Sequence, residues 1–148
     1  MHLSKAEVFN LKAYRSIKDI PEEVDLAYVM IRAFLVPQTL DECGEKGVKG
    51  AIIATSGFKE VGEESLNLEI QQVAAKWGIR FLCPNCLGFY NSSNKLNTTS
   101  VPVYPQKGPL GIISQPGSAG IHNFVTAKRM GIGLSKAIGH AGDREAQG

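Results

Sequence analysis

The chain has 148 residues, 43% of them hydrophobic and 20% charged, and its formal net charge at pH 7 is +2. This composition is typical of a soluble globular domain and excludes a disordered polar chain. No apolar run reaches the roughly 18 residues of a membrane-spanning helix, and no more than two basic residues are adjacent, so we expect neither a membrane nor a nucleic acid partner.

The first part of the chain alternates between apolar runs and helical patterns. Apolar runs predict buried strands at 26–34, 48–55 and 79–82. Helical spacing predicts helices at 37–46 and 63–77, the first ended by Gly47 and the second by Gly78. This order is typical of an α/β fold with parallel strands and right-handed crossovers.

The later part of the chain repeats the pattern after a polar connector. Residues 91–108 have no helical period, which indicates a connector containing at most a short hairpin. A strand at 110–114, a helix at 118–130 and a strand at 134–138 follow. We therefore predict two domains, at 1–105 and 106–148.

Two predicted strands run directly into loops with polar or small residues. The first loop, Cys83–Phe89, follows the third strand, and the second, Ser114–Ser118, opens onto a helix. Ligands bind at the carboxyl ends of strands in open α/β sheets, and a helix N-terminus favours an anion. The pair predicts a site for a phosphorylated or nucleotide-like ligand, although Ser118 is also explained as a simple N-cap.

Three other motifs have both a functional and an ordinary interpretation. Thr55–Glu60 is either a ligand-binding turn or a plain strand-to-helix connection. Cys83 and Cys86 have the spacing of a redox or zinc pair, but a polar anchoring role for Asn85 is favoured. His140 lies between small residues, where it is either an exposed nucleophile or part of a tail.

The cysteine count also bears on location. The chain has three cysteines and does not open with an apolar stretch like that of a signal peptide. An odd number of thiols without such a segment is typical of a reducing compartment. We expect a cytoplasmic protein with free cysteines.

Five motifs in order resemble one known family. Together they resemble the NDP-forming acyl-CoA synthetases, the succinyl-CoA synthetase α-subunit superfamily, and most of all the ADP-forming acetate–CoA ligase branch. The motifs are Lys12–Pro21, Val24–Ala27, Gly44–Gly50, Ser56–Glu60 and Pro84–Gly88.

The resemblance implies a Rossmann-like CoA-binding domain followed by the start of a flavodoxin-like ligase domain. Such enzymes convert acyl-CoA, phosphate and NDP to a carboxylic acid, CoA and NTP, through an acyl phosphate and a phosphohistidine. They use Mg²⁺ and ADP or ATP, and an ATP-grasp β subunit or domain. Homo-oligomers are also expected.

The resemblance also implies roles for individual residues. It places CoA beside Ile31, Arg32 and a turn made of Thr55, Ser56, Gly57 and Phe58. It places the acyl phosphate or carboxylic acid beside Asn85 and Cys86. It implies phosphate binding by Ser114, Gly117 and Ser118, and no resident metal in this segment.

Several features depart from the family pattern. The family's first strand, glycine-rich CoA loop and phosphohistidine segment are not seen in the sequence. The family usually has Pro where this chain has Arg32, Gly where it has Cys83, and a small residue where it has Pro116. His140 is not assigned the phosphohistidine role. We expect the isolated chain to be inactive as a ligase and to bind CoA weakly. Two alternatives stay open: a ligand-sensing module of a protein acetyltransferase, and a decayed fragment.

Overall fold

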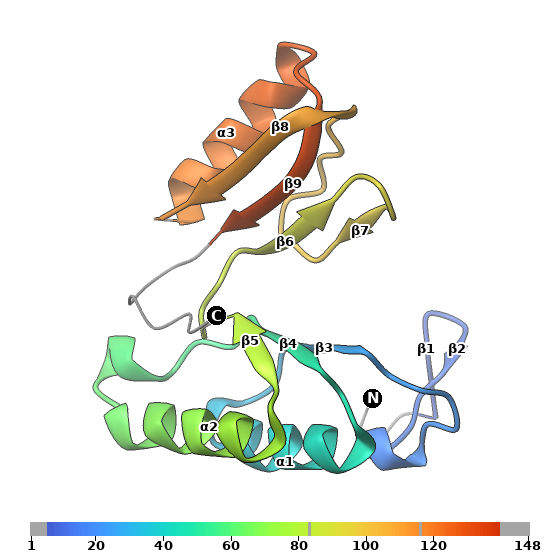
Figure 1. Ribbon diagram of the computed structural model, residues 1–148, viewed down its shortest axis with the longest axis vertical. Helices are drawn as coiled ribbons and strands as arrows, with labels where there is room; N and C mark the ends of the chain where they lie inside the picture. Colours follow the sequence, from blue (N-terminus) through green and yellow to red (C-terminus); the bar gives the residue numbers. More distant parts are fainter. Residues whose placement is uncertain (1–5, 83, 116, 140–148) are drawn as a thin grey trace.

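Among the described residues, the fold has two main sheets, each with its own helix layer (Figure 1). The structure is a computed structural model and describes residues 6–82, 84–115 and 117–139. A small hairpin, β1 (Glu7–Val8) and β2 (Leu11–Lys12), precedes the first sheet. No helix within the described ranges has the length and apolarity needed to cross a membrane.

The first sheet has three parallel strands in chain order, β3 (Leu26–Val29), β4 (Gly50–Ile53) and β5 (Arg80–Leu82). Both connecting helices, α1 (Val36–Lys46) and α2 (Glu64–Trp77), lie on the same face of this sheet (Figure 1). The predicted alternation of strands and helices is confirmed, and with it the Rossmann-like α/β class.

Two glycines end the helices as the sequence predicts. Gly47 caps α1 with φ 88°, and Gly78 caps α2 with φ 66°. Both angles lie in the left-handed region, which a residue without a Cβ adopts at little cost. The helices then pack tightly, because Gly44 on α1 leaves room for the indole of Trp77 on α2.

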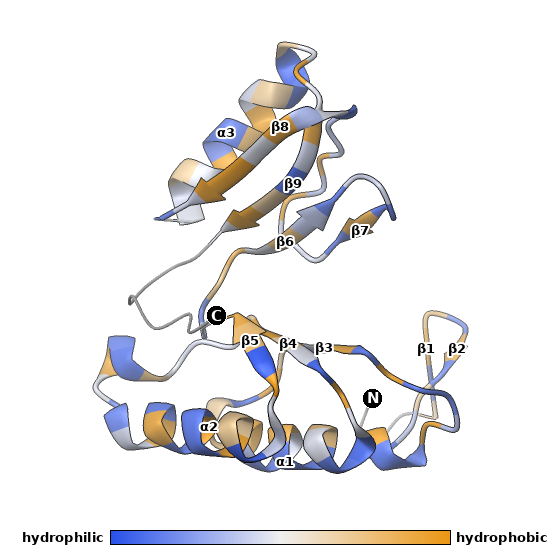
Figure 2. Cartoon of the chain, viewed as in Figure 1, coloured by the Kyte–Doolittle hydropathy of each residue, from blue (hydrophilic) through white to orange (hydrophobic). Residues whose placement is uncertain are grey.

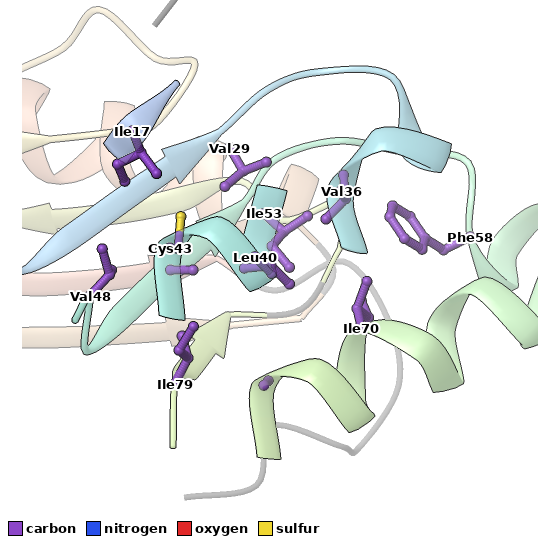
Figure 3. Close-up of a cluster of buried hydrophobic side chains, with 12 residues drawn as sticks. Ile17, Val29, Val36, Leu40, Cys43, Val48, Ile53, Phe58, Ile70 and Ile79 are labelled. Carbon is purple, nitrogen blue, oxygen red and sulfur yellow. The ribbon is translucent and has the colours of Figure 1, made fainter. Parts of the chain in front are cut away.

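The core of the first unit lies between its sheet and its helices (Figure 3). Apolar side chains from the strands, both helices and the short 3₁₀ helix at Ile17–Asp19 fill it. Its fully buried members include Val36, Leu40, Ile53, Phe58 and Ile70. Figure 2 shows the hydrophilic residues of α1 and α2 on the side away from the sheet, as expected for helices that cover a core.

The first strand is shorter and more exposed than predicted. β3 ends at Val29, and a 3₁₀ helix at Ala33–Leu35 leads directly into α1, so the predicted strand to residue 34 is wrong at its end. Leu26 is 41% and Tyr28 43% exposed, so the prediction of a fully buried strand is also wrong. Within the described part of the chain, β3 pairs with β4 alone.

The second sheet has the order β7-β6-β9-β8. Its strands are β6 (Gly88–Asn91), β7 (Leu96–Asn97), β8 (Lys107–Ser114) and β9 (Leu134–Gly139). β8 and β9 are parallel, and α3 (Gly117–Arg129) connects them and packs on both, as the predicted strand–helix–strand unit requires. Phe124 of α3 meets the ring of Tyr90 of β6 edge to face, at 4.9 Å between ring centroids.

β6 was not expected from the sequence. It pairs antiparallel with β9, more than forty residues further along the chain. The predicted division between residues 105 and 106 thus falls inside the stretch that builds this sheet. The division itself stays a prediction.

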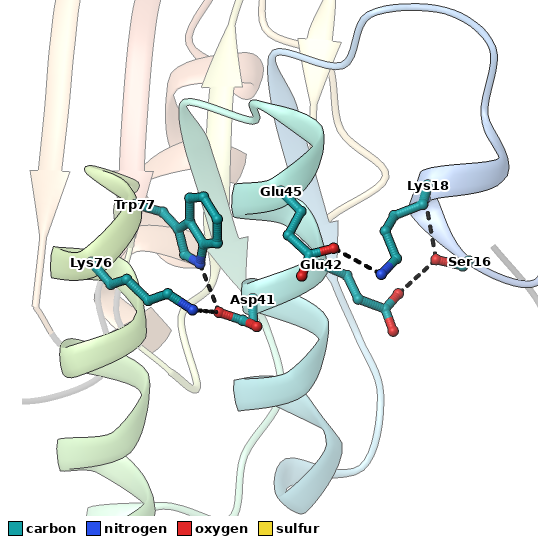
Figure 4. A network of polar contacts seen from close by, with 7 residues as sticks. All are labelled: Ser16, Lys18, Asp41, Glu42, Glu45, Lys76 and Trp77. Atoms are coloured by element: carbon teal, nitrogen blue, oxygen red, sulfur yellow. Dashed lines mark hydrogen bonds and ion pairs between the residues drawn. The ribbon is translucent and has the colours of Figure 1, made fainter.

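Polar contacts fasten the outer side of α1 to its neighbours (Figure 4). Asp41 Oδ1 accepts hydrogen bonds from Lys76 Nζ and from Trp77 Nε1, both at 2.7 Å. On the other flank, Glu42 accepts from the Ser16 hydroxyl at 2.7 Å and Glu45 pairs with Lys18 at 2.8 Å. These contacts fix α1 between α2 and the segment before β3.

Candidate functional site

The carboxyl ends of β3 and β4 are joined by the side chain of Thr55. Its Oγ1 accepts a hydrogen bond from the backbone N–H of Ile31 at 3.1 Å and donates to the Ile31 carbonyl at 2.9 Å. Thr55 is 7% exposed and Ile31 is 38% exposed, so both bonds are partly buried. The sequence placed both residues at one site, and the structure brings them together.

The turn after Thr55 exposes two backbone N–H groups that already have an acceptor. The carboxylate of Glu60 accepts from Gly57 N at 2.5 Å and from Phe58 N at 3.2 Å. Gly57 has φ 105°, and a Cβ there would lie 3.2 Å from Cβ of Ala33, so the position favours glycine twice over. A ligand anion at these two amides has to displace Glu60.

Phe58 has a different environment from the rest of the turn. Its side chain is 1% exposed and belongs to the core, which leaves only its backbone for a ligand. Ser56, by contrast, is exposed. The assignment of both to CoA binding stays a prediction.

A cavity of about 390 Å³ lies beside this turn, at the start of α2. Its walls come from the segment after β3, from the turn after β4 and from the first turns of α2. The lining residues are Ala33, Phe34, Gly57, Glu63, Ser65, Leu66 and Glu69. Sequence reasoning missed Phe34, Glu63 and Glu69. The available signal was their position, since each lies within a few residues of a predicted strand end or helix start.

A cationic side chain, that of Arg32, contacts one of the residues that line this cavity. The guanidinium of Arg32 lies 4.9 Å from the ring centroid of Phe34, and both side chains are exposed. A larger hollow, of about 450 Å³, lies between α2 and the amino end of β5, lined by residues such as Gln71, Arg80 and Phe81. Because ligands of open α/β sheets bind at the carboxyl ends of strands, the smaller cavity is the better candidate site.

The segment after β5 touches both sheets. Asn85 N donates to the carbonyl of Thr55 at 2.9 Å, and the Cys86 thiol donates to the carbonyl of Ile53 at 3.5 Å. The next residue, Leu87, donates its N–H to Gly139 of β9 at 3.0 Å. We call Asn85–Leu87 the bridging segment, because its consecutive residues are bonded to β4 and then to β9.

The two predicted catalytic residues, Asn85 and Cys86, differ in access. Asn85 adopts φ 59°, a left-handed conformation that Asn tolerates better than most residues, and it is half-buried. Cys86 is only 8% exposed, so its thiol has little access to a ligand. Burial raises the pKa of the nearby Tyr28 hydroxyl, and Cys86 adds to that effect. Cys83 lies outside the described residues, so the Cys-x-x-Cys pair has no structural description.

The predicted phosphate-binding residues lie at the end of β8 and the start of α3. Ser114 ends β8 and is 7% exposed, and a Cβ on Gly117 would lie 3.6 Å from Cβ of Leu87. α3 begins at Gly117, so Ser118 lies in its first turn and is not the N-cap that the sequence suggested. Pro116 and His140 lie outside the described residues.

The described part of the chain contains no cluster of side chains that could bind a metal ion. Across residues 6–82, 84–115 and 117–139, no three His, Cys, Asp or Glu side chains converge to hold an ion. The residues brought together are instead hydroxyl, amide and backbone groups, which bind and orient a ligand through hydrogen bonds.

Comparison with known proteins gives a consistent result. Residues 1–92 match the family described as "CoA binding domain". The chain is 44% identical over 140 residues to subunit alpha of ADP-forming acetate–CoA ligase II of Pyrococcus furiosus, a match covering 93% of this chain and 30% of the relative. It is 42% identical over 132 residues to an ADP-forming acetate–CoA ligase of Methanocaldococcus jannaschii, covering 89% of this chain and 19% of that protein.

A solved structure agrees in fold. It is the dinucleotide-forming acetyl-coenzyme A synthetase 1 of Ca. Korarchaeum cryptofilum in complex with phosphate and ADP, with TM-score 0.90 and 35% identity. The match covers 95% of this chain and 30% of that one. The chain thus spans a third or less of these relatives. On these matches, the chain belongs to the CoA-binding domain family of the NDP-forming acyl-CoA synthetases.

Proposed function

We propose that this chain binds coenzyme A at the carboxyl ends of β3 and β4, as part of an NDP-forming acid–CoA ligase. The observation that carries the proposal is the pair of hydrogen bonds between Thr55 and Ile31, which we call the Thr55–Ile31 clamp. It holds the two strand ends together beside a cavity of about 390 Å³. Ile31, Arg32 and the residues 55–58 surround this point. Backbone groups and small side chains there suit a long ligand with several polar groups.

The bridging segment gives the proposal its second part. Asn85 bonds to the end of β4, and Leu87 packs beside Gly117 at the start of α3. We assign the acyl phosphate or carboxylic acid to the space near Asn85 and Cys86, and phosphate to Ser114, Gly117 and Ser118. A helix N-terminus stabilises a phosphate through its free N–H groups and its dipole.

The full reaction also involves groups that the described residues do not hold. In our proposal, acyl-CoA, phosphate and NDP give the acid, CoA and NTP, with an acyl phosphate and a phosphohistidine as intermediates. An ATP-grasp β subunit or domain would hold the adenine nucleotide and Mg²⁺. No three metal-ligating side chains converge among the described residues, so no step is assigned to a metal here.

Nuclear magnetic resonance titration of the ¹⁵N-labelled chain with CoA tests the proposal. At 16.0 kDa the chain is small enough for amide-resolved spectra, which detect weak as well as tight binding. We expect saturable shifts for the amides of Ile31, Gly57 and Asn85. The amide of Gln71, beside the larger hollow at β5, serves as an internal control and should not move.

The position of the shifts decides between outcomes. Shifts confined to the strand ends support CoA binding at the proposed site. An absence of shifts at millimolar CoA, or shifts centred on Gln71 and Arg80, would show that the strand ends are not the binding site.

A further inference from the structure

We propose that Arg32 and Phe34 form the subsite for the 3′-phosphoadenosine end of CoA, with adenine stacked on Phe34 and the 3′-phosphate paired with Arg32. The inference rests on the proposed CoA binding and adds an orientation to it. It starts from the side chains of Arg32 and Phe34, which belong neither to the Thr55–Ile31 clamp nor to the hydrophobic core.

The first observation is the exposure of an aromatic ring beside a cation. Phe34 is 62% exposed, although a ring of this size is usually buried in a folded domain. It lies in the 3₁₀ turn after β3 and forms part of the cavity wall. The Arg32 guanidinium lies 4.9 Å from its ring centroid. An exposed ring with an adjacent guanidinium is suited to a nucleobase and the phosphate attached to its ribose, because bases stack on aromatic faces and Arg pairs with phosphate.

The second observation is the polarity of the cavity. Glu63 and Glu69 line the wall contributed by α2, and no Lys or Arg is among the lining residues. Arg32 is a cation beside the lining, at the Phe34 side. A phosphate is repelled by the carboxylates and attracted to the guanidinium, so a nucleotide enters with its phosphate toward Arg32. The carboxylates accept hydrogen bonds from amino groups, and adenine carries an amino group that would face them.

The choice of the 3′-phosphate follows from its chemistry. It is a terminal monoester that carries between one and two negative charges at neutral pH, and it presents several oxygens to a bidentate guanidinium. The 5′-diphosphate of CoA is internal, and such groups are commonly held by backbone N–H groups. A single exposed Arg therefore matches the terminal phosphate better.

The test compares CoA with 3′-dephospho-CoA, which lacks only that phosphate, on the full 148-residue chain by amide-shift titration. We expect Arg32→Gln to weaken CoA binding about tenfold, roughly 1.4 kcal/mol, and to leave 3′-dephospho-CoA binding unchanged. Phe34→Ala should weaken both ligands alike. Arg80→Gln, which removes an exposed Arg at the far edge of the sheet, is the matched control and should affect neither.

Each other result has a definite meaning. If Arg32→Gln weakens both ligands equally, or neither, the 3′-phosphate assignment is wrong while CoA binding stands. If Phe34→Ala has no effect on either ligand, adenine does not stack there. If the wild-type chain shows no CoA-dependent shifts, the subsite and the proposed function fail together. Both substituted side chains are exposed, and the amide spectrum of each variant reports directly whether it is folded.

Discussion

The indole of Trp77 lies directly against the backbone of Gly44. A Cβ built on Gly44 would be 2.0 Å from Cγ and 2.3 Å from Cδ1 of the ring, far closer than two carbon atoms can approach. The contact joins the last turn of α1 to the last residue of α2. The two helices can therefore pack at this distance only when residue 44 has no side chain.

Gly44→Ala should destabilise the protein by about 1–3 kcal/mol, as overpacking usually does. The sign of the stability change is informative, because replacing Gly by Ala in an unconstrained helix stabilises the helix by roughly 0.5–1 kcal/mol. Urea unfolding followed by circular dichroism measures the difference. In a Trp77→Ala background the penalty should disappear. An equal penalty in both backgrounds would show that the indole is not its cause.

Thr55→Val should lower the free energy of unfolding by about 0.5–1.5 kcal/mol, because the N–H of Ile31 loses the acceptor of a part-buried hydrogen bond. Thr55→Ser keeps the hydroxyl and is the matched control. Amide hydrogen exchange at Ile31 provides a local readout, and it should accelerate in the Val variant alone. Unchanged exchange in the Val variant would mean that the hydroxyl does not hold the strand ends.

Asp41 should make stability depend on pH in the acid range. Hydrogen bonds from Lys76 and then from Trp77 hold the pKa of its carboxyl below the ordinary value. A lowered folded-state pKa contributes stability that is present above about pH 3.9 and is lost as the pH falls through the folded value. The Tm difference between wild type and Asp41→Asn should therefore shrink between pH 6 and pH 3. A difference independent of pH would contradict this assignment.

The Cys43 thiol should resist alkylation in the folded protein. Burial, and to a lesser degree the Glu42 carboxylate, raises its pKa to about 11. The neutral thiol is favoured in the fold, so its contribution to stability is complete below the unfolded value of about 8.5 and is lost as the pH rises toward 11. Mass spectrometry after iodoacetamide treatment at pH 8 should find Cys43 modified only when denaturant is present. Rapid labelling without denaturant would show that the site opens locally.

The outer edge of β3 should cause self-association at high concentration. The carbonyls of Asp25 and Val29 accept bonds from the β4 side, so the alternate residues Leu26 and Tyr28 direct their backbone groups to the other edge. Within the described residues no strand pairs there. Leu26→Lys should reduce concentration-dependent association in analytical ultracentrifugation, because a charge on an edge strand blocks pairing. Leu68→Lys, at another exposed leucine on α2, should not reduce it.

Local signals account for the elements that were predicted well. α1 and α2 end where Gly47 and Gly78 supply left-handed backbone, a conformation that glycine adopts more readily than other residues. The strand at β3 was predicted too long because an apolar run does not by itself specify an extended backbone. At Ala33 the chain turns into a 3₁₀ helix while its sequence stays apolar.

Non-local pairing accounts for what was missed. β6 forms because β9 lies beside it, and its four residues, Gly-Phe-Tyr-Asn, are too short a run to show that on their own. Similarly, the sequence gives no sign that the indole N–H of Trp77 bonds to Asp41 on another helix. The position of Thr55 at a strand end was predictable. Its bonds to Ile31, and the occupation of the Gly57 amide by Glu60, depend on backbone geometry that only the folded chain has.

The bridging segment has a consequence for any attempt to dissect the molecule. A piece ending at residue 82 would lose the bonds from Asn85 and Cys86 that finish the end of β4. A piece starting at residue 88 would leave Gly139 without the N–H of Leu87. Only a division between Cys86 and Leu87 keeps each set of bonds within one piece. A fragment boundary anywhere else in the bridging segment removes contacts from one of the two sheets.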